Sequence, residues 1–307
     1  MRNAFIKTLE KIAEKNKKIF LIVGDLGFSV IENFKIKYPS RFLNAGIAEQ
    51  NMIGVSAGLA LKGKLPFVYS IIPFVTMRCF EQIRDDLCYQ NLNVKLIGVG
   101  GGFAYGTAGS THHAIEDIAI MRALPNMTII CPGDPLESEA AIINAAKTYG
   151  PTYIRLGKGG EKIIHNLDII KEFKIGKGIV LAKGKDVTLI TTGGMLHTGK
   201  EICENLKKEG VNAGLISMHT IKPIDKELIK NISKNTNAIF TLEDHNIIGG
   251  LGSSVAECLC ENGFKGKFKI FGIPDSYPKV TGSQEFLREY FKIDQKSLLS
   301  IIKKELK

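Results

Sequence analysis

The chain has 307 residues, of which 44% are hydrophobic and 23% are charged, as is usual for folded globular proteins. This composition excludes disordered, collagen-like and coiled-coil proteins, and the length predicts two domains. The net charge of +10 allows a nucleic-acid partner but suits phosphorylated metabolites equally well, and the scattered lysines are more typical of a solvated surface.

Neither a secretory signal nor a membrane-spanning helix is predicted. The N-terminal residues lack the apolar core of a signal, and the longest apolar runs are far shorter than the roughly 20 residues that span a bilayer. A cytoplasmic protein without a membrane partner is therefore expected. None of the six cysteines forms a CxxC motif, so reduced, mostly buried thiols and no metal site of the chain's own are predicted.

Short apolar runs alternate with amphipathic stretches in the first half of the chain. In chain order, the pattern predicts a helix at 2–17, a strand at Ile19–Val23, helices at 47–62 and 74–88 on either side of a strand at Pro66–Ile71, strands at Val94–Val99 and Met127–Cys131, a helix at 135–148 and a strand at Tyr153–Leu156. Such alternation is typical of a mostly parallel sheet covered by helices.

A connector rich in glycine and lysine follows, and then the alternation starts again. It predicts strands at Val187–Thr191, Ala213–Ser217, Ala238–Leu242 and Lys267–Phe271, with helices at 195–209, 225–234 and after the glycine turn of 249–262. The predicted fold is α/β with two domains, each a mostly parallel sheet flanked by helices. The first covers 1–160, a linker covers 161–177, and the second covers 178–307.

Glycine-rich segments do not support a nucleotide enzyme. GVGGGF at 98–103 follows a strand but opens no helix, so it fails the dinucleotide-binding pattern, and no GxxxxGK[ST] segment exists. GGLGSSVAE at 249–257 does open a helix. It could bind an anion at the helix N-terminus, or its glycines could only allow close packing.

Two ionisable residues are candidates for chemistry. Glu49 lies in the first turn of an almost wholly apolar helix. It could favour the helix dipole, or it could stand at the edge of an apolar site and exchange a proton. His112 follows a glycine-rich loop and could contact a substrate or only cap a helix. A metal site would need more ligands at suitable spacing, and none is obvious.

Seven segments match transketolases in order. They are GDLG (24–27), RFLNAGIAEQNMIGVSAGLAL (41–61), FEQIRDD (80–86), AGSTHHAIEDIAIMRALPNM (108–127), GPTYIRLGKGG (150–160), TIKPID (220–225) and LEDHNIIGGLGSSVAE (242–257). The chain resembles the C-terminal half of a transketolase, the pyrimidine-binding domain followed by the C-terminal domain. It is more distantly similar to deoxyxylulose-phosphate synthase and to the β subunits of 2-oxoacid dehydrogenases.

The resemblance implies a thiamine diphosphate enzyme that transfers a two-carbon ketol unit between sugars. In that family a glutamate binds the pyrimidine ring nitrogen and takes part in the proton relay that activates the cofactor. Glu49 matches this catalytic residue, and Phe74 matches the aromatic residue that packs on the aminopyrimidine. Asp25, in GDLG, is expected beside the cofactor.

The resemblance also assigns residues to the sugar. His112 matches a histidine that contacts sugar hydroxyls and is expected in catalysis, while Arg2 and Arg155 match arginines that bind the substrate phosphate. An acidic residue and a histidine that contact the sugar in the family fall on Ala108 and Gly100. Substrates other than the usual pentose phosphates are therefore expected.

Three further family positions are also changed. A phosphate-binding serine falls on Phe5, and two aromatic residues of the cofactor pocket fall on Ile71 and Met77.

Family members hold the diphosphate through Mg²⁺ with a GDG segment and a downstream asparagine, and this chain has no GDG. A separate N-terminal subunit is therefore expected to supply the Mg²⁺ ligands, with active sites at subunit interfaces of a two-plus-two heterotetramer. Sugars, and neither nucleic acid nor membranes, are the expected partners. The alternatives are a deoxyxylulose-phosphate synthase-like or 2-oxoacid dehydrogenase β-like subunit, and a non-catalytic structural subunit.

Overall fold

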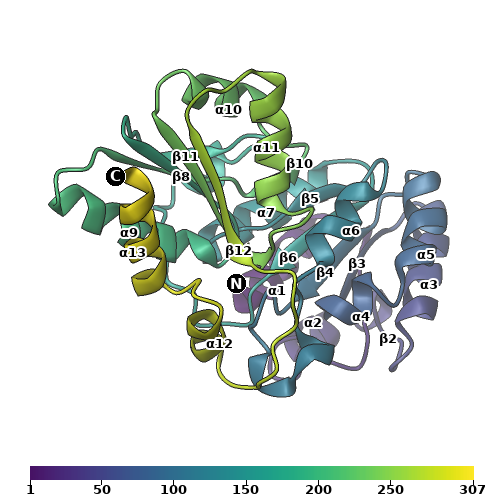
Figure 1. The fold of residues 1–307 in the computed structure, drawn as a ribbon. Helices are drawn as coiled ribbons and strands as arrows, with labels where there is room; N and C mark the ends of the chain where they lie inside the picture. The colour runs from purple at the N-terminus through teal and green to yellow at the C-terminus, as the bar shows by residue number, and fades with distance from the viewer.

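The structure is a computed structural model that describes residues 1–307, and it contains two sheets (Figure 1). The first has seven strands in the order β10-β5-β6-β4-β3-β1-β2. All neighbours in it are parallel except β10, which pairs antiparallel with β5. Its strands are β1 (Ile19–Val23), β2 (Phe42–Asn44), β3 (Leu65–Ile71), β4 (Lys95–Val99), β5 (Thr128–Ile130), β6 (Thr152–Leu156) and β10 (Thr220–Lys222).

The second sheet has five strands in the order β12-β11-β8-β9-β7, and only the edge strand β7 is antiparallel. Its strands are β7 (Ile179–Ala182), β8 (Val187–Thr191), β9 (Ala213–Ser217), β11 (Ala238–Asn246) and β12 (Lys267–Ile273). The predicted α/β class with two mostly parallel sheets is confirmed. One difference is that β10, from the second half of the chain, completes the first sheet.

Helices cover both sheets on both faces. They are α1 (Arg2–Lys15), α2 (Glu32–Lys37), α3 (Glu49–Leu61), α4 (Ile72–Thr76), α5 (Phe80–Gln82), α6 (Asp117–Ala123), α7 (Pro135–Lys147), α8 (Ile169–Glu172), α9 (Met195–Lys208), α10 (Lys226–Ser233), α11 (Leu251–Glu261), α12 (Gln284–Tyr290) and α13 (Gln295–Leu306). The predicted helix at 74–88 is broken into α4, α5 and a π-helical turn at Ile83–Tyr89. The Thr76 hydroxyl donates to the Ile72 carbonyl oxygen, a local bond that bends helices.

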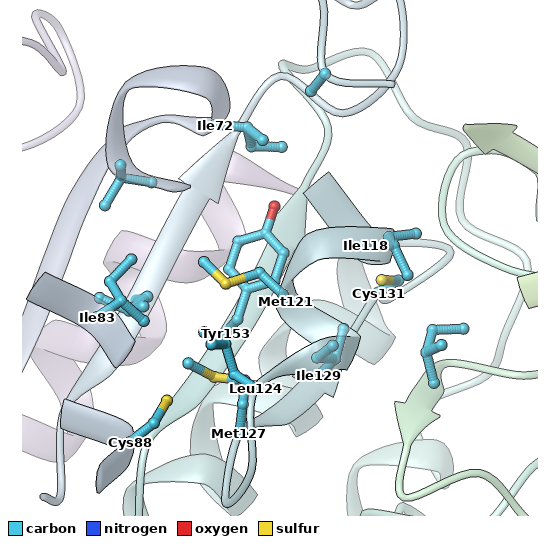
Figure 2. Packing of buried hydrophobic residues seen from close by; sticks show 14 of the residues in the cluster. Ile72, Ile83, Cys88, Ile118, Met121, Leu124, Met127, Ile129, Cys131 and Tyr153 are labelled. Atoms are coloured by element: carbon cyan, nitrogen blue, oxygen red, sulfur yellow. The ribbon is translucent and has the colours of Figure 1, made fainter. Parts of the chain in front are cut away.

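Alternate residues of the first sheet serve two different cores. Leu21 and Val23 of β1 belong to the cluster that includes residues of α1 and α7, whereas Ile22 belongs to the cluster that includes residues of α3. That second cluster has 32 buried residues and continues into the second sheet, where it includes Ile190 and Ile239. Figure 2 shows part of it, including Met121, Ile129 and Tyr153. The two sheets therefore share one apolar core.

The segment between the sheets is held by a buried ionic cluster. The backbone N–H of His165 donates to the Asp134 carboxylate at 2.8 Å, and the ring Nδ1 atom lies 3.1 Å from the same oxygen. The ring Nε2 atom lies 3.3 Å from the Glu137 carboxylate. Burial would raise the pKa of Asp134, but its hydrogen bonds with His165, Ile164 and Glu137 lower it to about 2. Burial would lower the pKa of His165, but the two carboxylates raise it. The segment is thus attached to the first sheet's α7.

The glycine turn before α11 binds an anion that belongs to the chain itself. Glu243 of β11 is fully buried and accepts hydrogen bonds from the backbone N–H groups of Leu251 and Gly252, at 2.7 and 2.8 Å. Burial raises the pKa of Glu243 to about 7. A Cβ atom at Gly250 would lie 1.9 Å from a Glu243 carboxylate oxygen. The glycines therefore allow this close approach. The Glu243 carboxylate then occupies the place at the helix N-terminus where an external anion would bind.

All six cysteines are free and only Cys260 is exposed, as the sequence predicted. None of the helices has both the length and the apolar character that a membrane crossing would require.

We expect Gly250→Ala to lower the free energy of unfolding of the isolated chain by about 3 kcal/mol. The new methyl group would push the Glu243 carboxylate away from the N-terminus of α11 and leave a buried charge without its hydrogen bonds. Urea denaturation followed by circular dichroism measures the effect. Cys260→Ala, at an exposed position of the same helix, is the control. An unchanged midpoint for Gly250→Ala would show that Glu243 does not hold this helix.

Candidate active site

The candidate residues meet at one edge of the first sheet, where its parallel strands end. Gly24 follows β1, α4 follows β3, Gly100 follows β4 and Gly157 follows β6. In open parallel sheets this carboxyl edge is where ligands bind. The loop from Gly100 to Glu116 carries His112 across this edge, and backbone hydrogen bonds between Gly102 and Ala114 close the loop.

Glu49, at the start of α3, is buried with only 2% of its surface exposed. It lies against Gly24, whose Cβ atom, if present, would be 3.5 Å from the Glu49 Cγ atom and 3.4 Å from the Ser70 hydroxyl. The Ser70 hydroxyl is buried and has no hydrogen-bond partner. Arg78 donates from Nη1 to the Glu49 carboxylate at 2.8 Å. The buried Glu49 carboxylate therefore lies near the Ser70 hydroxyl, which makes no hydrogen bond within the chain.

A row of neighbouring side chains starts at Glu49 and comprises, in order, Arg78, Phe74, His112, Tyr105 and Lys158. The Arg78 guanidinium lies 4.6 Å from the Phe74 ring centre, and the His112 ring meets the Phe74 ring edge-on at 5.1 Å. The Tyr105 ring lies 6.3 Å from the His112 ring, and the Lys158 ammonium lies 4.8 Å from the Tyr105 ring centre. The structure therefore brings together Glu49, Phe74 and His112, three of the residues selected from the sequence.

Glu49 and Phe74 together fit a flat group that both donates hydrogen bonds and stacks. Arg78 already meets both conditions, because its guanidinium contacts the Glu49 carboxylate and the Phe74 ring. An aminopyrimidine ring would use the same carboxylate and the same aromatic face. The residues present thus fit the pyrimidine part of thiamine diphosphate.

Unlike the residues that fit the pyrimidine, a cluster of metal ligands is not found in the structure. No group of three or more His, Cys, Asp or Glu side chains lies close enough together to bind a metal ion. Asp25 is exposed beside Gly24 with a left-handed φ of 50°, and its carboxylate accepts a hydrogen bond from the Asn44 amide at 2.9 Å. Asp25 therefore lies near Glu49 without a cationic partner.

Arg155 is directed mainly into the protein. It is 4% exposed, and its Nε atom donates to Asp117 at 2.9 Å. Its Nη2 atom donates to the carbonyl oxygens of Ala114 and Asp244, both at 2.8 Å. Arg155 also lines a cavity of about 350 Å³ between the two sheets, next to Gly101 and Gly193.

Arg2 lies near two tyrosines, Tyr69 and Tyr105. Burial raises the pKa of both Tyr69 and Tyr105, and the nearby positive charge of Arg2 opposes the rise. Phe5 is fully buried and stacks on Tyr69 at 5.6 Å between ring centres, so it belongs to the core.

Sequence reasoning missed three of these side chains, Arg78, Tyr105 and Lys158. The signals were weak: an arginine within the helix predicted at 74–88, a tyrosine in a glycine-rich loop, and a lysine in GKGG after β6. Ala108 is exposed and adds no polar side chain to the loop. Gly100 has a left-handed φ of 97°, and a Cβ atom there would lie 2.3 Å from the Tyr105 ring.

Comparisons with known proteins agree with the geometry. Residues 1–160 match the family model of the transketolase pyrimidine-binding domain, and residues 176–298 match that of the transketolase C-terminal domain. A transketolase C-terminal section from Methanocaldococcus jannaschii is 39% identical, covering 100% of this chain and 96% of that protein. One of the subunits of apulose-4-phosphate transketolase from Phocaeicola vulgatus is 36% identical over 94% and 92% of the two chains.

Other relatives are longer or more distant. The chain spans about half of 1-deoxy-D-xylulose-5-phosphate synthase from Desulfotalea psychrophila, which is 35% identical over 96% of this chain and 46% of that protein. Among solved structures, a split-gene transketolase described as an inactive β4 tetramer superimposes with a TM-score of 0.90 at 38% identity, over 99% and 97% of the chains. With two domain models, whole-length relatives and the same fold in agreement, the chain belongs to the transketolase family, as a counterpart of its C-terminal half.

Proposed function

We propose that the chain is the C-terminal subunit of a two-subunit, thiamine diphosphate-dependent transketolase-like enzyme that transfers a two-carbon ketol unit between sugars or sugar phosphates. The observation that carries the proposal is the pair of Glu49 and Phe74, a buried carboxylate and an aromatic face that contact one flat group together. The transketolase subunits among the relatives support the transferase class.

In this proposal Glu49 is the catalytic carboxylate. Bound thiamine diphosphate supplies a carbon centre that stabilises the negative charge formed during carbon–carbon cleavage. Glu49 holds a proton at the pyrimidine ring nitrogen, and Phe74 orients the ring by stacking. Burial of Glu49 excludes water from that proton. Asp25, which is exposed next to Gly24, would also contact the cofactor.

Cofactor binding then requires Arg78 to move. The guanidinium uses the same carboxylate and the same ring that the pyrimidine would use, so both cannot bind at once. The Arg78 side chain is 45% exposed, which lets it turn toward solvent without breaking the core.

The sugar lies on the other side of Phe74 in this proposal. His112 contacts sugar hydroxyls, and the cations Arg2, Arg155 and Lys158 attract the anionic end of the substrate. Ala108 and Gly100 offer no polar side chain, which favours sugars other than the usual pentose phosphates. Two relatives are transketolase subunits named for apulose 4-phosphate and for 6-deoxy-6-sulfo-D-fructose, both anionic sugars.

An N-terminal partner subunit supplies the Mg²⁺ and diphosphate ligands in this proposal, and the working form is a two-plus-two heterotetramer in the cytoplasm. The free thiols suit a reducing compartment. The names of two relatives, a C-terminal section and a subunit of a larger enzyme, support a partner chain. A solved relative described as a β4 tetramer supports self-association. The boundaries 1–160, 161–177 and 178–307 are proposed as the domain limits.

The surface of α3 is a suitable place for self-association. A Cβ atom at Gly54 or Gly58 would meet nothing within 4 Å, and Leu61 is 65% exposed. Ile47, just before the helix, is 79% exposed. After the polar first turn, the exposed face of α3 carries only apolar or small residues, and such a face is normally buried. We infer that a second copy of this chain covers α3, in line with the β4 relative.

We expect Glu49→Gln to lower the ketol-transfer kcat of the reconstituted complex by about 10²- to 10⁴-fold, because the amide cannot exchange the proton that the carboxylate holds. The assay uses the chain mixed with its partner subunit, thiamine diphosphate and Mg²⁺. Glu204→Gln, at an exposed position on α9, is the control. Unchanged turnover in Glu49→Gln would favour a non-catalytic structural subunit.

The isolated chain should show no ketol transfer, and adding the partner subunit should restore it. The complex should not consume pyruvate, whereas a deoxyxylulose-phosphate synthase-like or 2-oxoacid dehydrogenase-like enzyme would. Product analysis by mass spectrometry with a panel of sugars, and separately with pyruvate, distinguishes the two classes. Turnover by the chain alone would refute the split-enzyme proposal, and xylulose 5-phosphate as the best donor would refute the specialised substrate.

Gly58→Arg should lower the oligomeric state of the chain without unfolding it, because the position is open in the single chain but would place a charge inside the proposed interface. Analytical ultracentrifugation measures the mass, and circular dichroism confirms the fold. Glu204→Arg is the control at a distant exposed helix. An unchanged mass for Gly58→Arg would show that α3 is not the contact between copies.

A further inference from the structure

We propose that Phe291, in the second half of the chain, is a positioning residue for the sugar step. Its ring holds the loop of residues 100–116 so that His112 stays beside Phe74. For the role of His112 the proposal rests on the proposed function, and it adds that the second half of the chain takes part in sugar recognition through this loop. Three features carry it: stacking of Phe291 on Phe103, close contacts of the chain around α12 with two loop glycines, and the hydrogen bonds that fix α12 to β11.

The ring of Phe103 connects Phe291 with the histidines of the loop. Phe103 is fully buried, and Phe291 stacks on it with 5.5 Å between the ring centres and 6° between the ring planes. The His113 ring meets the Phe103 ring edge-on at 5.2 Å, and its Nε2 atom lies 3.2 Å from the carbonyl oxygen of Gly106. His113 directly follows His112. Two ring contacts therefore link Phe291 to the neighbour of His112.

These rings belong to a small apolar cluster that joins the loop to the last part of the chain. Its buried members come from the loop and from the chain after β11, and Phe291 packs against them. They are Phe103, Ile115, Ile273, Leu287 and Ile293. The cluster is distinct from the core that the two sheets share. The second half of the chain therefore buries the apolar side chains of the loop.

Two glycines let the second half of the chain approach the loop backbone closely. Gly102 has a left-handed φ of 61°, and a Cβ atom there would lie 2.1 Å from the Asp244 carboxylate. A Cβ atom at Gly106 would lie 2.5 Å from the carbonyl oxygen of Gly282 and 2.8 Å from the Leu287 Cδ1 atom. A larger residue at either position would push the loop away from these contacts.

The helix that precedes Phe291 is fixed to the second sheet. Asp244 of β11 is 3% exposed, and its Oδ2 atom accepts hydrogen bonds from Gln284 Nε2 at 3.1 Å and from Arg288 Nε at 3.2 Å. Both donors belong to α12, which ends directly before Phe291. Phe291 is thus presented to the loop by a helix that is itself anchored.

Loss of the Phe291 ring should affect the sugar and not the cofactor. Phe103 would lose its stacking partner, and the loop would be free to shift. The His112 ring, now 5.1 Å from the Phe74 ring centre, would move relative to it, and a misplacement of about 1 Å can slow a reaction about 10²-fold. Glu49 is held by α3 and Phe74 by α4, so the pair that fits the pyrimidine would stay in place.

Hydrogen–deuterium exchange of the full chain, followed by mass spectrometry, tests whether Phe291 holds the loop. Phe291→Leu keeps an apolar side chain but removes the ring, and it should speed exchange in residues 100–116 about tenfold while α3 exchanges as in the wild type. Phe291→Tyr keeps the ring and should restore wild-type exchange. Phe286→Leu, the same change at a side chain of α12 that is 46% exposed, is the matched control.

Kinetics of the reconstituted complex test the role in the sugar step. With each donor sugar of the panel, xylulose 5-phosphate and fructose 6-phosphate among them, Phe291→Leu should lower kcat/KM about tenfold and leave the Kd of thiamine diphosphate unchanged. Phe291→Tyr should keep kcat/KM within about twofold of the wild type. Because Phe291 acts through His112, adding Phe291→Leu to His112→Ala should change kcat/KM by no more than about twofold.

Unchanged exchange in residues 100–116 of Phe291→Leu, or faster exchange along the whole chain, would overturn the proposal. Losses that multiply in the double variant, or a weaker Kd of thiamine diphosphate in Phe291→Leu, would reduce Phe291 to a structural residue and also overturn it. If exchange rises in the loop alone while the complex transfers no ketol unit from any sugar of the panel, Phe291 holds the loop and the proposed function is wrong.

Discussion

The buried ion pair between Arg155 and Asp117 is the contact on which the rest of this structure depends. Arg155 comes from β6 of the first sheet and also donates to the backbone of Asp244 in β11 of the second sheet. Its bond to the carbonyl oxygen of Ala114 fixes the end of the loop that carries Tyr105 and His112. The Tyr153 hydroxyl donates to the same Asp117 carboxylate at 2.6 Å. One guanidinium thus joins the two sheets and the loop that carries His112.

Such a pair is costly to form and more costly to break. Moving two charges out of water carries a large desolvation penalty, and removal of one partner leaves the other charge buried without compensation, at about 3–5 kcal/mol. Two further bonds from Nη2 to backbone carbonyl oxygens help to offset the burial of Arg155. These bonds anchor one end of the loop that carries His112 to the buried core.

The sequence was sufficient to select Glu49, Phe74 and His112 as candidates that lie close together in the structure. Phe74 follows the predicted strand Pro66–Ile71, and a parallel sheet brings the ends of its strands to one edge. Glu49 and His112 were selected by their residue type and by resemblance to the family, and the structure places both near Phe74. The sequence was not sufficient for Arg78, Tyr105 and Lys158, because stacking and cation–π contacts depend on side-chain placement that no periodicity encodes. The strands of both sheets were predicted well, except the short ones that pair at sheet edges, such as β2, β7 and β10.

The place of β10 has a consequence for how the chain can be divided. This strand lies far along the sequence, after β9, yet it covers the free edge of β5 in the first sheet. A fragment that ended in the segment between the sheets would expose that edge, and open strand edges pair with other chains and aggregate. Division of the chain between its two sheets would therefore remove an edge strand from the first sheet as well as separate it from the second.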